Sequence, residues 1–231
     1  MSRPSKMRTQ RRGIGGNGPL DRRDRIIRQE LASLPADALV IDIGSGVLRR
    51  LDLAETQRYF STDIRALPNV DFVADATAMS LATDCADAVL VLEVLEHVRR
   101  PRELLEEVRR VLKPGGVIMV SVPSTVPRHD ENDYWRFTAQ GLSELCSGLF
   151  TQGEVHVLGG TFEALAYVLG YYISLVAHQL RIPVRSVRDA LMAVGYWLDS
   201  HNKWSSSATD LHTLAFDVFF VGKARSDGDV D

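Results

Sequence analysis

The residues best suited to chemistry begin with a pair of glycines. An apolar run ends in Asp42, and Gly44 and Gly46 follow it with only Ser45 between them. Glycines at this spacing let the chain turn sharply after a strand and bring main-chain N–H groups close to a nucleotide-like ligand. The third glycine of the longer Gly-x-Gly-x-x-Gly pattern is absent, which disfavours binding of NAD. The pattern therefore predicts a cofactor loop of another kind.

Acids close the next three apolar runs of the chain. Asp63 ends the second run, Asp75 the third, and Glu93 follows the fourth. Because parallel strands end at the same edge of a sheet, we expect these acids and Asp42 to border one crevice. An acid at the end of the second strand is well placed to accept hydrogen bonds from both hydroxyls of a ribose, as in dinucleotide folds. We expect Asp63 to have that role.

Another polar segment follows the fifth apolar run. Its His129 is a candidate general base, because an imidazole takes up a proton near neutral pH. The alternative is that Asp133, Tyr134 and Arg136 only lock the loop by hydrogen bonds, with Trp135 and Phe137 buried. The sequence favours this structural role for Arg136 and Phe137 and leaves the role of His129 open.

The elements that position these residues alternate between strands and helices. This alternation favours a parallel sheet with helices on both faces. The predicted fold class is α/β: a Rossmann-like, doubly wound, mainly parallel seven-stranded sheet with a helical insertion before the last strand, which we place at the edge of the sheet. The expected strands are Leu39–Ile43, Arg58–Ile64, Val70–Ala74, Ala86–Leu92, Val117–Val122, Glu154–Leu158 and Leu214–Gly222. The expected helices are Asp21–Leu34, Pro101–Leu112 and Thr138–Ser147.

Two features of the predicted helices depend on single residues. Periodicity places Arg23 of the first helix on its polar side, with the other arginines. Thr138 stands where the third helix begins and is expected to cap it.

The whole chain is the size of one α/β domain. It has 231 residues, of which 45% are hydrophobic and 25% charged, and its net charge of −3 gives no reason to expect a nucleic-acid partner. Two distant cysteines argue against a thiolate zinc site and a disulfide scaffold. No apolar segment follows the basic N-terminus, so we expect a cytoplasmic protein rather than a secreted one. We predict a basic tail over 1–20, a domain over 21–225 and an acidic tail over 226–231.

The predicted helical insertion, residues 162–202, is strongly apolar. No charged residue lies between Glu163 and Arg181. The stretch is short for a membrane span, which needs ~20 apolar residues. It is expected to be a buried lid or a contact between two copies of the chain, and the alternative is a helix that faces lipid in a peripheral membrane contact.

Five sequence blocks, taken together and in order, resemble the class I methyltransferases that use S-adenosylmethionine, of the broad type-11 group. The blocks are VIDIGSG at 40–46, STDI at 61–64, VADA at 73–76, DCADAVLVLEVLEHV at 84–98 and RVLKPGGVIMVSVP at 110–123. The segment at 129–138 is similar to a His-Asp-x-x-x-Asp-Tyr-x-Arg-Phe-Thr pattern of a bacterial subgroup. The resemblance implies a cofactor site in which glycines approach the methionine part, Asp63 binds ribose and Asp75 meets adenine. The expected cofactor-binding residues are Asp42, Gly44, Ser45, Gly46, Asp63, Ile64, Asp75, Ala76 and Glu93.

The same resemblance extends to a possible metal site. Some RNA 2′-O-methyltransferases and ubiquinone-pathway O-methyltransferases carry a similar Glu-x-x-Glu-His that binds a divalent metal, here Glu93, Glu96 and His97. Such a site could hold Mg²⁺ or Mn²⁺ beside a substrate hydroxyl and lower its pKa. Many type-11 relatives carry the same letters without a known metal, so we leave the metal unassigned and expect none.

The sequence therefore predicts an S-adenosylmethionine-dependent methyltransferase, with His97 and His129 as the candidate catalytic residues. The acceptor is expected to be a hydroxyl on a small molecule, a sugar or a lipid-linked intermediate. One alternative is a non-catalytic binding or scaffold protein, which a cofactor pocket blocked by Leu48 or Arg49 would favour. The other alternative is metal-assisted RNA 2′-O-methylation.

Overall fold

The structure, a computed structural model, describes residues 18–47, 57–180, 185–201 and 214–225. Residues 1–17 of the tail predicted at 1–20 lie outside the described residues, and so do the tail predicted at 226–231, Leu48 and Arg49.

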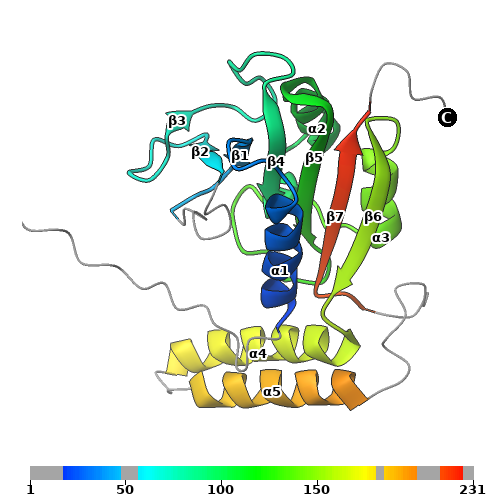
Figure 1. The fold of residues 1–231 in the computed structure, drawn as a ribbon. Coiled ribbons are helices and arrows are strands. Elements are labelled where there is room, and N and C mark those ends of the chain that lie inside the picture. Colours follow the sequence, from blue (N-terminus) through cyan, green and yellow to red (C-terminus); the bar gives the residue numbers. More distant parts are fainter. Residues whose placement is uncertain (1–17, 48–56, 181–184, 202–213, 226–231) are drawn as a thin grey trace, which may run out of the picture.

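A seven-stranded sheet forms the centre of the molecule (Figure 1). Its strand order is β3-β2-β1-β4-β5-β7-β6, and β7 runs antiparallel to both of its neighbours while the other pairs are parallel. The strands are β1 (Leu39–Ile43), β2 (Arg58–Asp63), β3 (Phe72–Val73), β4 (Ala86–Leu92), β5 (Leu112–Pro123), β6 (Phe150–Leu158) and β7 (Asp217–Ala224). The mainly parallel seven-stranded sheet predicted from the sequence is confirmed.

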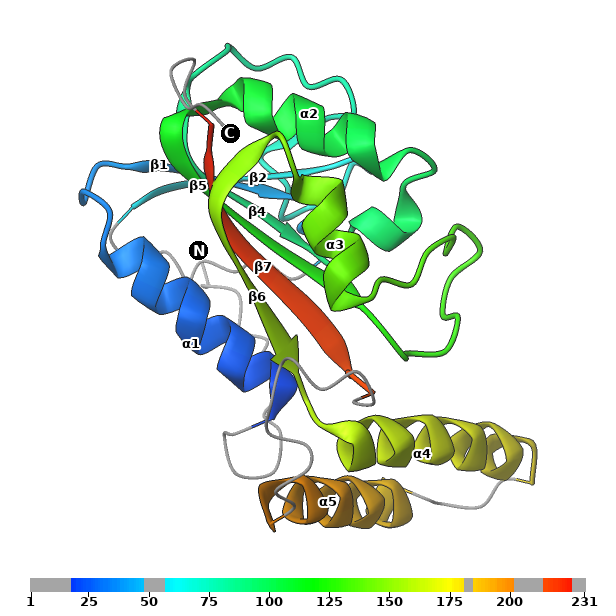
Figure 2. The same cartoon turned by 90° about the vertical axis from the view of Figure 1, so that its right-hand side faces the viewer.

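Helices cover both faces of this sheet, as predicted. The helix α1 (Pro19–Ala32) lies on one face, and α2 (Pro101–Val111) and α3 (Ala139–Cys146) lie on the other (Figure 2). The central strand β4 is apolar on both sides because Val89 and Val91 pack under α2 while Ala88 and Leu90 pack under α1. Burial on both faces explains why this strand reads as a continuous apolar run.

The prediction that the last strand lies at the edge of the sheet is wrong. The strand β7 sits between β5 and β6, and its residues Val218, Phe219 and Phe220 are buried. The edge strand is β6, whose sequence FTQGEVHVL mixes in the polar and charged residues that an edge tolerates. The apolar residues of β7 are buried because strands pair with β7 on both sides.

Two further helices form a hairpin between β6 and β7. The helix α4 (Thr161–Leu180) starts two residues after β6, and α5 (Arg185–His201) returns beside it. Because β6 runs parallel to β5, the hairpin leaves the sheet at the carboxyl ends of the parallel strands, and Figures 1 and 2 show it beyond that edge. Asp199 of α5 fastens the start of α4 by accepting hydrogen bonds from the main-chain N–H groups of Phe162 at 3.2 Å and Glu163 at 2.7 Å.

Two local predictions for the helices have different outcomes. Thr138 caps α3 as expected, because its Oγ1 accepts a hydrogen bond from the main-chain N–H of Gly141 at 3.0 Å. Arg23, expected on the polar side of α1, is instead buried. Its guanidinium reaches carboxylates at the sheet edge, and this pairing makes its burial possible.

Candidate functional site

The glycine loop after β1 has the backbone shape that its sequence predicts. Gly44 and Gly46 adopt left-handed φ angles of 65° and 63°. A Cβ on Gly44 would lie 2.6 Å from a methyl group of Val94, whereas a Cβ on Gly46 would meet no atom of the described residues within 4 Å. Ser45 ties the loop to the sheet by donating its main-chain N–H to the Thr62 carbonyl at 3.0 Å. The loop is thus tightly packed on one side and leaves open space at Gly46.

Asp63 lies at the end of β2, beneath this loop. Its Oδ2 accepts the main-chain N–H of Gly46 at 3.1 Å, and its Oδ1 accepts the main-chain N–H and Nε of Arg65 at 2.9 and 3.1 Å. Burial works to raise the pKa of this carboxyl, but the hydrogen bonds from Arg65 and Gly46 outweigh it and lower the pKa. Asp63 is therefore an anionic acceptor held next to the open space at Gly46.

Apolar side chains stand exposed around the same strand ends. Ile64 is 69% exposed, Val47 63% and Val73 56%, although each follows or belongs to a strand of the sheet. Such an apolar surface beside an ionised acid suits a ligand that combines a flat ring with hydroxyl groups. The residues present therefore fit a nucleoside-bearing cofactor.

The remaining acids of the predicted cofactor site differ in their surroundings. Asp42 is wholly buried within β1 and accepts a hydrogen bond from the hydroxyl of Tyr59. Asp75 is exposed after β3, where its Oδ1 accepts hydrogen bonds from the N–H and Oγ1 of Thr77 at 2.9 and 2.8 Å, which lower its pKa. Ala76 packs against the hydrophobic core. Asp42 thus faces the interior, and Asp75 faces the surface.

Glu93 is half-buried and belongs to a charged group under α1 with two buried members, Arg23 and Asp217. It has a positive φ of 58°, and its Oε1 accepts a hydrogen bond from Ser121 Oγ and lies 3.6 Å from Nη1 of Arg23. Asp217 at the start of β7 is buried nearby, and burial together with the charge of Glu93 raises its pKa well above the usual value. Arg23 and Asp217 were missed by the sequence analysis, because nothing in their local pattern marks them as partners of Glu93.

A second group, the acceptor cluster, is formed by Glu96, His97 and His129. One donor atom from each side chain lies within 4.8 Å of the others, and the two imidazole rings meet edge to face with centroids 5.2 Å apart. Glu96 and His97 come from the short helix η1 (Leu95–His97) after β4, and His129 comes from the loop after β5. The two predicted catalytic histidines are thus neighbours in space. His129 stands where the Glu-x-x-Glu-His pattern placed Glu93.

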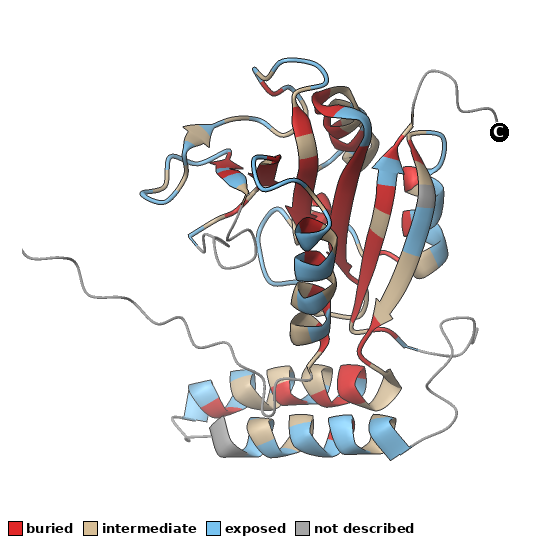
Figure 3. Ribbon diagram, in the orientation of Figure 1, coloured by how far each residue is buried: buried red, intermediate tan, exposed pale blue. Residues whose placement is uncertain are grey.

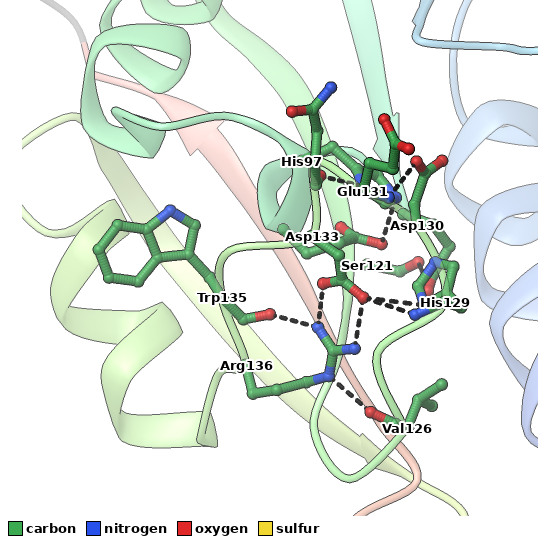
Figure 4. A network of polar contacts seen from close by, with 12 residues as sticks. His97, Ser121, Val126, His129, Asp130, Glu131, Asp133, Trp135 and Arg136 are labelled. Atoms are coloured by element: carbon green, nitrogen blue, oxygen red, sulfur yellow. Dashed lines mark hydrogen bonds and ion pairs between the residues drawn. The ribbon is translucent and has the colours of Figure 1, made fainter.

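Hydrogen bonds indicate the tautomers of both histidines (Figure 4). Nδ1 of His97 lies 2.6 Å from the Asn132 carbonyl oxygen, which can only accept, so Nδ1 carries the proton and Nε2 has a free lone pair. Nδ1 of His129 lies 3.2 Å from Oδ2 of Asp133, a contact that favours a proton on Nδ1, so the neutral form of this ring has its lone pair on Nε2. Both rings can therefore accept a proton or bind a cation through Nε2.

Asp133 is held as a carboxylate by Arg136. The guanidinium of Arg136 donates to both carboxylate oxygens and also to the Val126 carbonyl at 2.6 Å. The hydrogen bond from Arg136 lowers the pKa of Asp133 to about 2. This pair locks the loop, as one interpretation of the sequence predicted. Asp133 also orients His129, because it accepts a hydrogen bond from the main-chain N–H of His129 and lies 3.2 Å from Nδ1 of its ring.

The aromatic residues of the loop follow the prediction only in part. Phe137 is buried, but Trp135 is 43% exposed and donates its indole N–H to the Val98 carbonyl at 2.9 Å. The expected burial of Trp135 is wrong, because that hydrogen bond holds the ring across the loop surface.

Glu96 is the most unusual member of the acceptor cluster. It is fully buried, and neither carboxylate oxygen has a hydrogen-bond partner among the described residues, since Nε2 of His97 is 3.6 Å away. Burial, with the charge of Glu93, raises the pKa of Glu96 to about 8. A buried acid of this kind holds a proton or faces a cation.

An open pocket adjoins the cluster. Its volume is about 520 Å³, and it is lined by Arg128, His129, Asp130 and Glu131 of the β5–α3 loop and by Tyr171 of α4. His129 is therefore accessible from the surface, on the side of the sheet where the α4–α5 hairpin begins.

The strand order, the glycine loop after β1 and the acid after β2 are those of the class I methyltransferase fold. Residues 26–120 match the family model described as a methyltransferase domain. This part of the chain is a type-11 methyltransferase domain of the kind that uses S-adenosylmethionine.

Curated relatives match parts of the chain. The chain is 35% identical over 122 residues to the demethylmenaquinone methyltransferase of Clavibacter sepedonicus, which covers 51% of this chain and 46% of the relative. It is 28% identical over 102 residues to the ubiquinone biosynthesis O-methyltransferase of Xanthomonas oryzae pv. oryzae, covering 44% and 40%. The matches span less than half the length of these relatives.

Solved structures extend the likeness to most of the chain. An S-adenosylmethionine-dependent methyltransferase from Archaeoglobus fulgidus has a TM-score of 0.54 and 16% sequence identity, over 87% of this chain and 92% of that chain. At this identity the likeness concerns the fold.

Proposed function

We propose that the protein transfers a methyl group from S-adenosylmethionine to a hydroxyl oxygen. The observation that carries this proposal is the arrangement of two sites along one sheet edge. The glycine loop and Asp63 lie at the carboxyl ends of β1 and β2. The acceptor cluster lies just after the carboxyl ends of β4 and β5. When bound, the cofactor supplies a methyl group on a sulfonium, which is electrophilic without further activation.

The protein's own residues act mainly by holding the two partners. Asp63 accepts hydrogen bonds from the ribose hydroxyls, and the open space at Gly46 admits the methionine part. Ile64, Asp75 and Ala76 lie where the adenine end would rest. Because methyl transfer needs the acceptor in line with the sulfonium, positioning supplies much of the rate.

His129 takes the proton that the acceptor oxygen loses as the new O–CH₃ bond forms. In the neutral form of the ring Nε2 has the lone pair that accepts this proton, and Asp133 stabilises the imidazolium that results. The names of the quinone-pathway relatives agree with a small acceptor of this kind.

Binding and turnover test the proposal separately. Isothermal titration with S-adenosylmethionine should give binding for the wild type and at least tenfold weaker binding for Asp63→Ala, because the ribose loses its acceptor. Absence of binding, or an Asp63→Ala variant equal to the wild type, would refute the cofactor site and favour the scaffold alternative.

Turnover is followed as release of S-adenosylhomocysteine with a prenylated catechol, an alkyl glycoside or a ribonucleoside as the hydroxyl probe. His129→Ala should lower kcat by about 10²–10⁴ with little change in cofactor affinity. Asp133→Asn should move the pH profile of kcat, because the amide no longer stabilises the imidazolium. An unchanged profile would remove His129 as the base.

A divalent cation in the acceptor cluster is a second candidate for activating the hydroxyl. Glu96, which has no hydrogen-bond partner among the described residues, and the Nε2 atoms of neutral His97 and His129 would supply one oxygen and two nitrogens, a donor set that suits a transition metal. Calorimetric titration with Mn²⁺ should then show one site that Glu96→Gln abolishes, and EDTA should stop turnover. Turnover that survives EDTA and Glu96→Gln would leave His129 as the sole activating group.

A further inference from the structure

The α4–α5 hairpin exposes apolar side chains along both of its helices. On α4 they recur every three or four residues, which places them on one face of the helix. Their exposed fractions range from 46% to 64%, and Figure 3 shows exposed segments along both helices. We call this set the hairpin stripe: Leu165, Leu169, Tyr172, Val176 and Leu180 on α4, with Val187, Val194 and Trp197 on α5.

The stripe is not the surface that joins the hairpin to the rest of the molecule. The contact between the helices uses small residues, since a Cβ on Gly195 would lie 2.7 Å from the Phe162 carbonyl oxygen and 2.9 Å from Cβ of Ala166. Tyr167 of α4 packs its ring edge to face against Phe216, with centroids 4.8 Å apart. The large apolar side chains of the stripe therefore remain available for another surface.

Charge points to an anionic partner. Residues 164–188 contain three arginines, Arg181, Arg185 and Arg188, and no acidic residue. The first acid after them, Asp189, lies 3.6 Å from Nη2 of Arg188. Apolar side chains bordered by arginine, with tyrosine and tryptophan among them, are typical of helices that lie in the headgroup region of a lipid surface. A second copy of the chain would bring two arginine-bearing segments together.

The hairpin does not have the form of a membrane anchor that crosses the bilayer. Among the described residues, no helix combines the length and apolar character that a span requires. A helix of 20 residues that lies flat covers about 30 Å of surface, enough to insert a row of side chains.

We propose that the α4–α5 hairpin docks the protein on an anionic lipid surface and turns the pocket at His129 toward acceptors held there. The position of the pocket supports this proposal, since α4 contributes Tyr171 to its wall beside His129. The role of the pocket toward acceptors rests on the proposed methyl transfer, whereas docking on lipid does not.

Sedimentation with vesicles tests the docking. The full chain should sediment with phosphatidylcholine vesicles that contain phosphatidylglycerol and much less with phosphatidylcholine alone. Leu169→Gln combined with Val176→Gln should weaken binding at least tenfold, because two inserted side chains are lost. Arg185→Gln, at the start of α5, should weaken it about fivefold, with a smaller dependence on salt. Leu214→Gln, also an exposed apolar position but outside the helices, should bind as the wild type does.

Two controls separate the possible failures. S-adenosylmethionine binding by the double variant should equal that of the wild type, which shows that the domain is folded. A wild type that binds vesicles but not S-adenosylmethionine would refute the methyl transfer and leave the docking intact. Wild-type sedimentation that is absent, or unchanged in the double variant, overturns the docking. A wild type that light scattering shows as a dimer, with a monomeric double variant and no vesicle binding, would assign the stripe to a second copy instead.

Discussion

The two glycines of the cofactor loop allow a matched substitution test. Gly44→Ala and Gly46→Ala both place a Cβ at a φ near 65°, which costs about 1–2 kcal/mol in each case. Only Gly44→Ala also brings that Cβ to 2.6 Å from the Val94 methyl group, an overlap that adds about 1–3 kcal/mol. Urea unfolding should therefore show a loss of about 2–5 kcal/mol for Gly44→Ala and of about 1–2 kcal/mol for Gly46→Ala.

Cofactor affinity should follow the opposite order. Among the described residues nothing lies within 4 Å of a Cβ at Gly46, so we expect this Cβ to meet the cofactor. Calorimetry should show at least tenfold weaker S-adenosylmethionine binding for Gly46→Ala in spite of its smaller loss of stability.

Val94 provides the control for the steric argument. Adding Val94→Ala to Gly44→Ala removes the clashing methyl groups, so the double variant should recover about 1–3 kcal/mol relative to the sum of the single changes. Equal stability losses for the two glycine variants, or strict additivity with Val94→Ala, would refute the packing explanation.

Three further predictions concern buried charge and capping. The pKa of Glu96 is raised to about 8, so the folded wild type loses stability as the pH rises from about 5 to 8. Glu96→Gln has no carboxyl to ionise and should lose less stability over that range. In urea unfolding at pH 8 the variant should be more stable than the wild type by at least about 1 kcal/mol. Arg23→Met removes the cation beside Glu93 and Asp217 and should cost about 3–5 kcal/mol at pH 7. The loss should be smaller at pH 5, because the raised pKa of buried Asp217 lets it take up a proton; an equal loss at both values would contradict this. Thr138→Ala should cost about 1 kcal/mol, measured by thermal unfolding, and Thr138→Ser should restore it.

The fold could be predicted because its signals are local. Strands buried on both faces read as continuous apolar runs, and β1 and β4 begin and end where the sequence placed them. The helix α2 was equally legible, since Pro101 starts it and arginines end it. The position of β7 was not legible, because strand order depends on which runs pair across the sheet rather than on any one run.

The site was predictable to a lesser degree, for the same physical reason. The glycine loop and Asp63 lie close in sequence to the strands that position them, whereas Arg23 finds Glu93 seventy positions later in the chain. Helical periodicity assigns an arginine to the polar face and carries no information about a carboxylate in the interior that could pair with it. The Glu-x-x-Glu-His spacing likewise suggested three adjacent partners, but the backbone at Glu93 turns its side chain toward Ser121, and His129 completes the cluster from another loop.

The placement of the hairpin between two paired strands has an evolutionary consequence. Leu158 and Asp217 face each other in the β6–β7 ladder, so the chain leaves and re-enters the sheet at neighbouring points. Topologically, everything between them is the turn of a β-hairpin, and its length is free of the register that holds the sheet together. An insertion at this point can be lengthened, exchanged or lost while the glycine loop at the opposite half of the sheet stays as it is. Such a joint lets one methyltransferase core be fitted to many acceptors and locations.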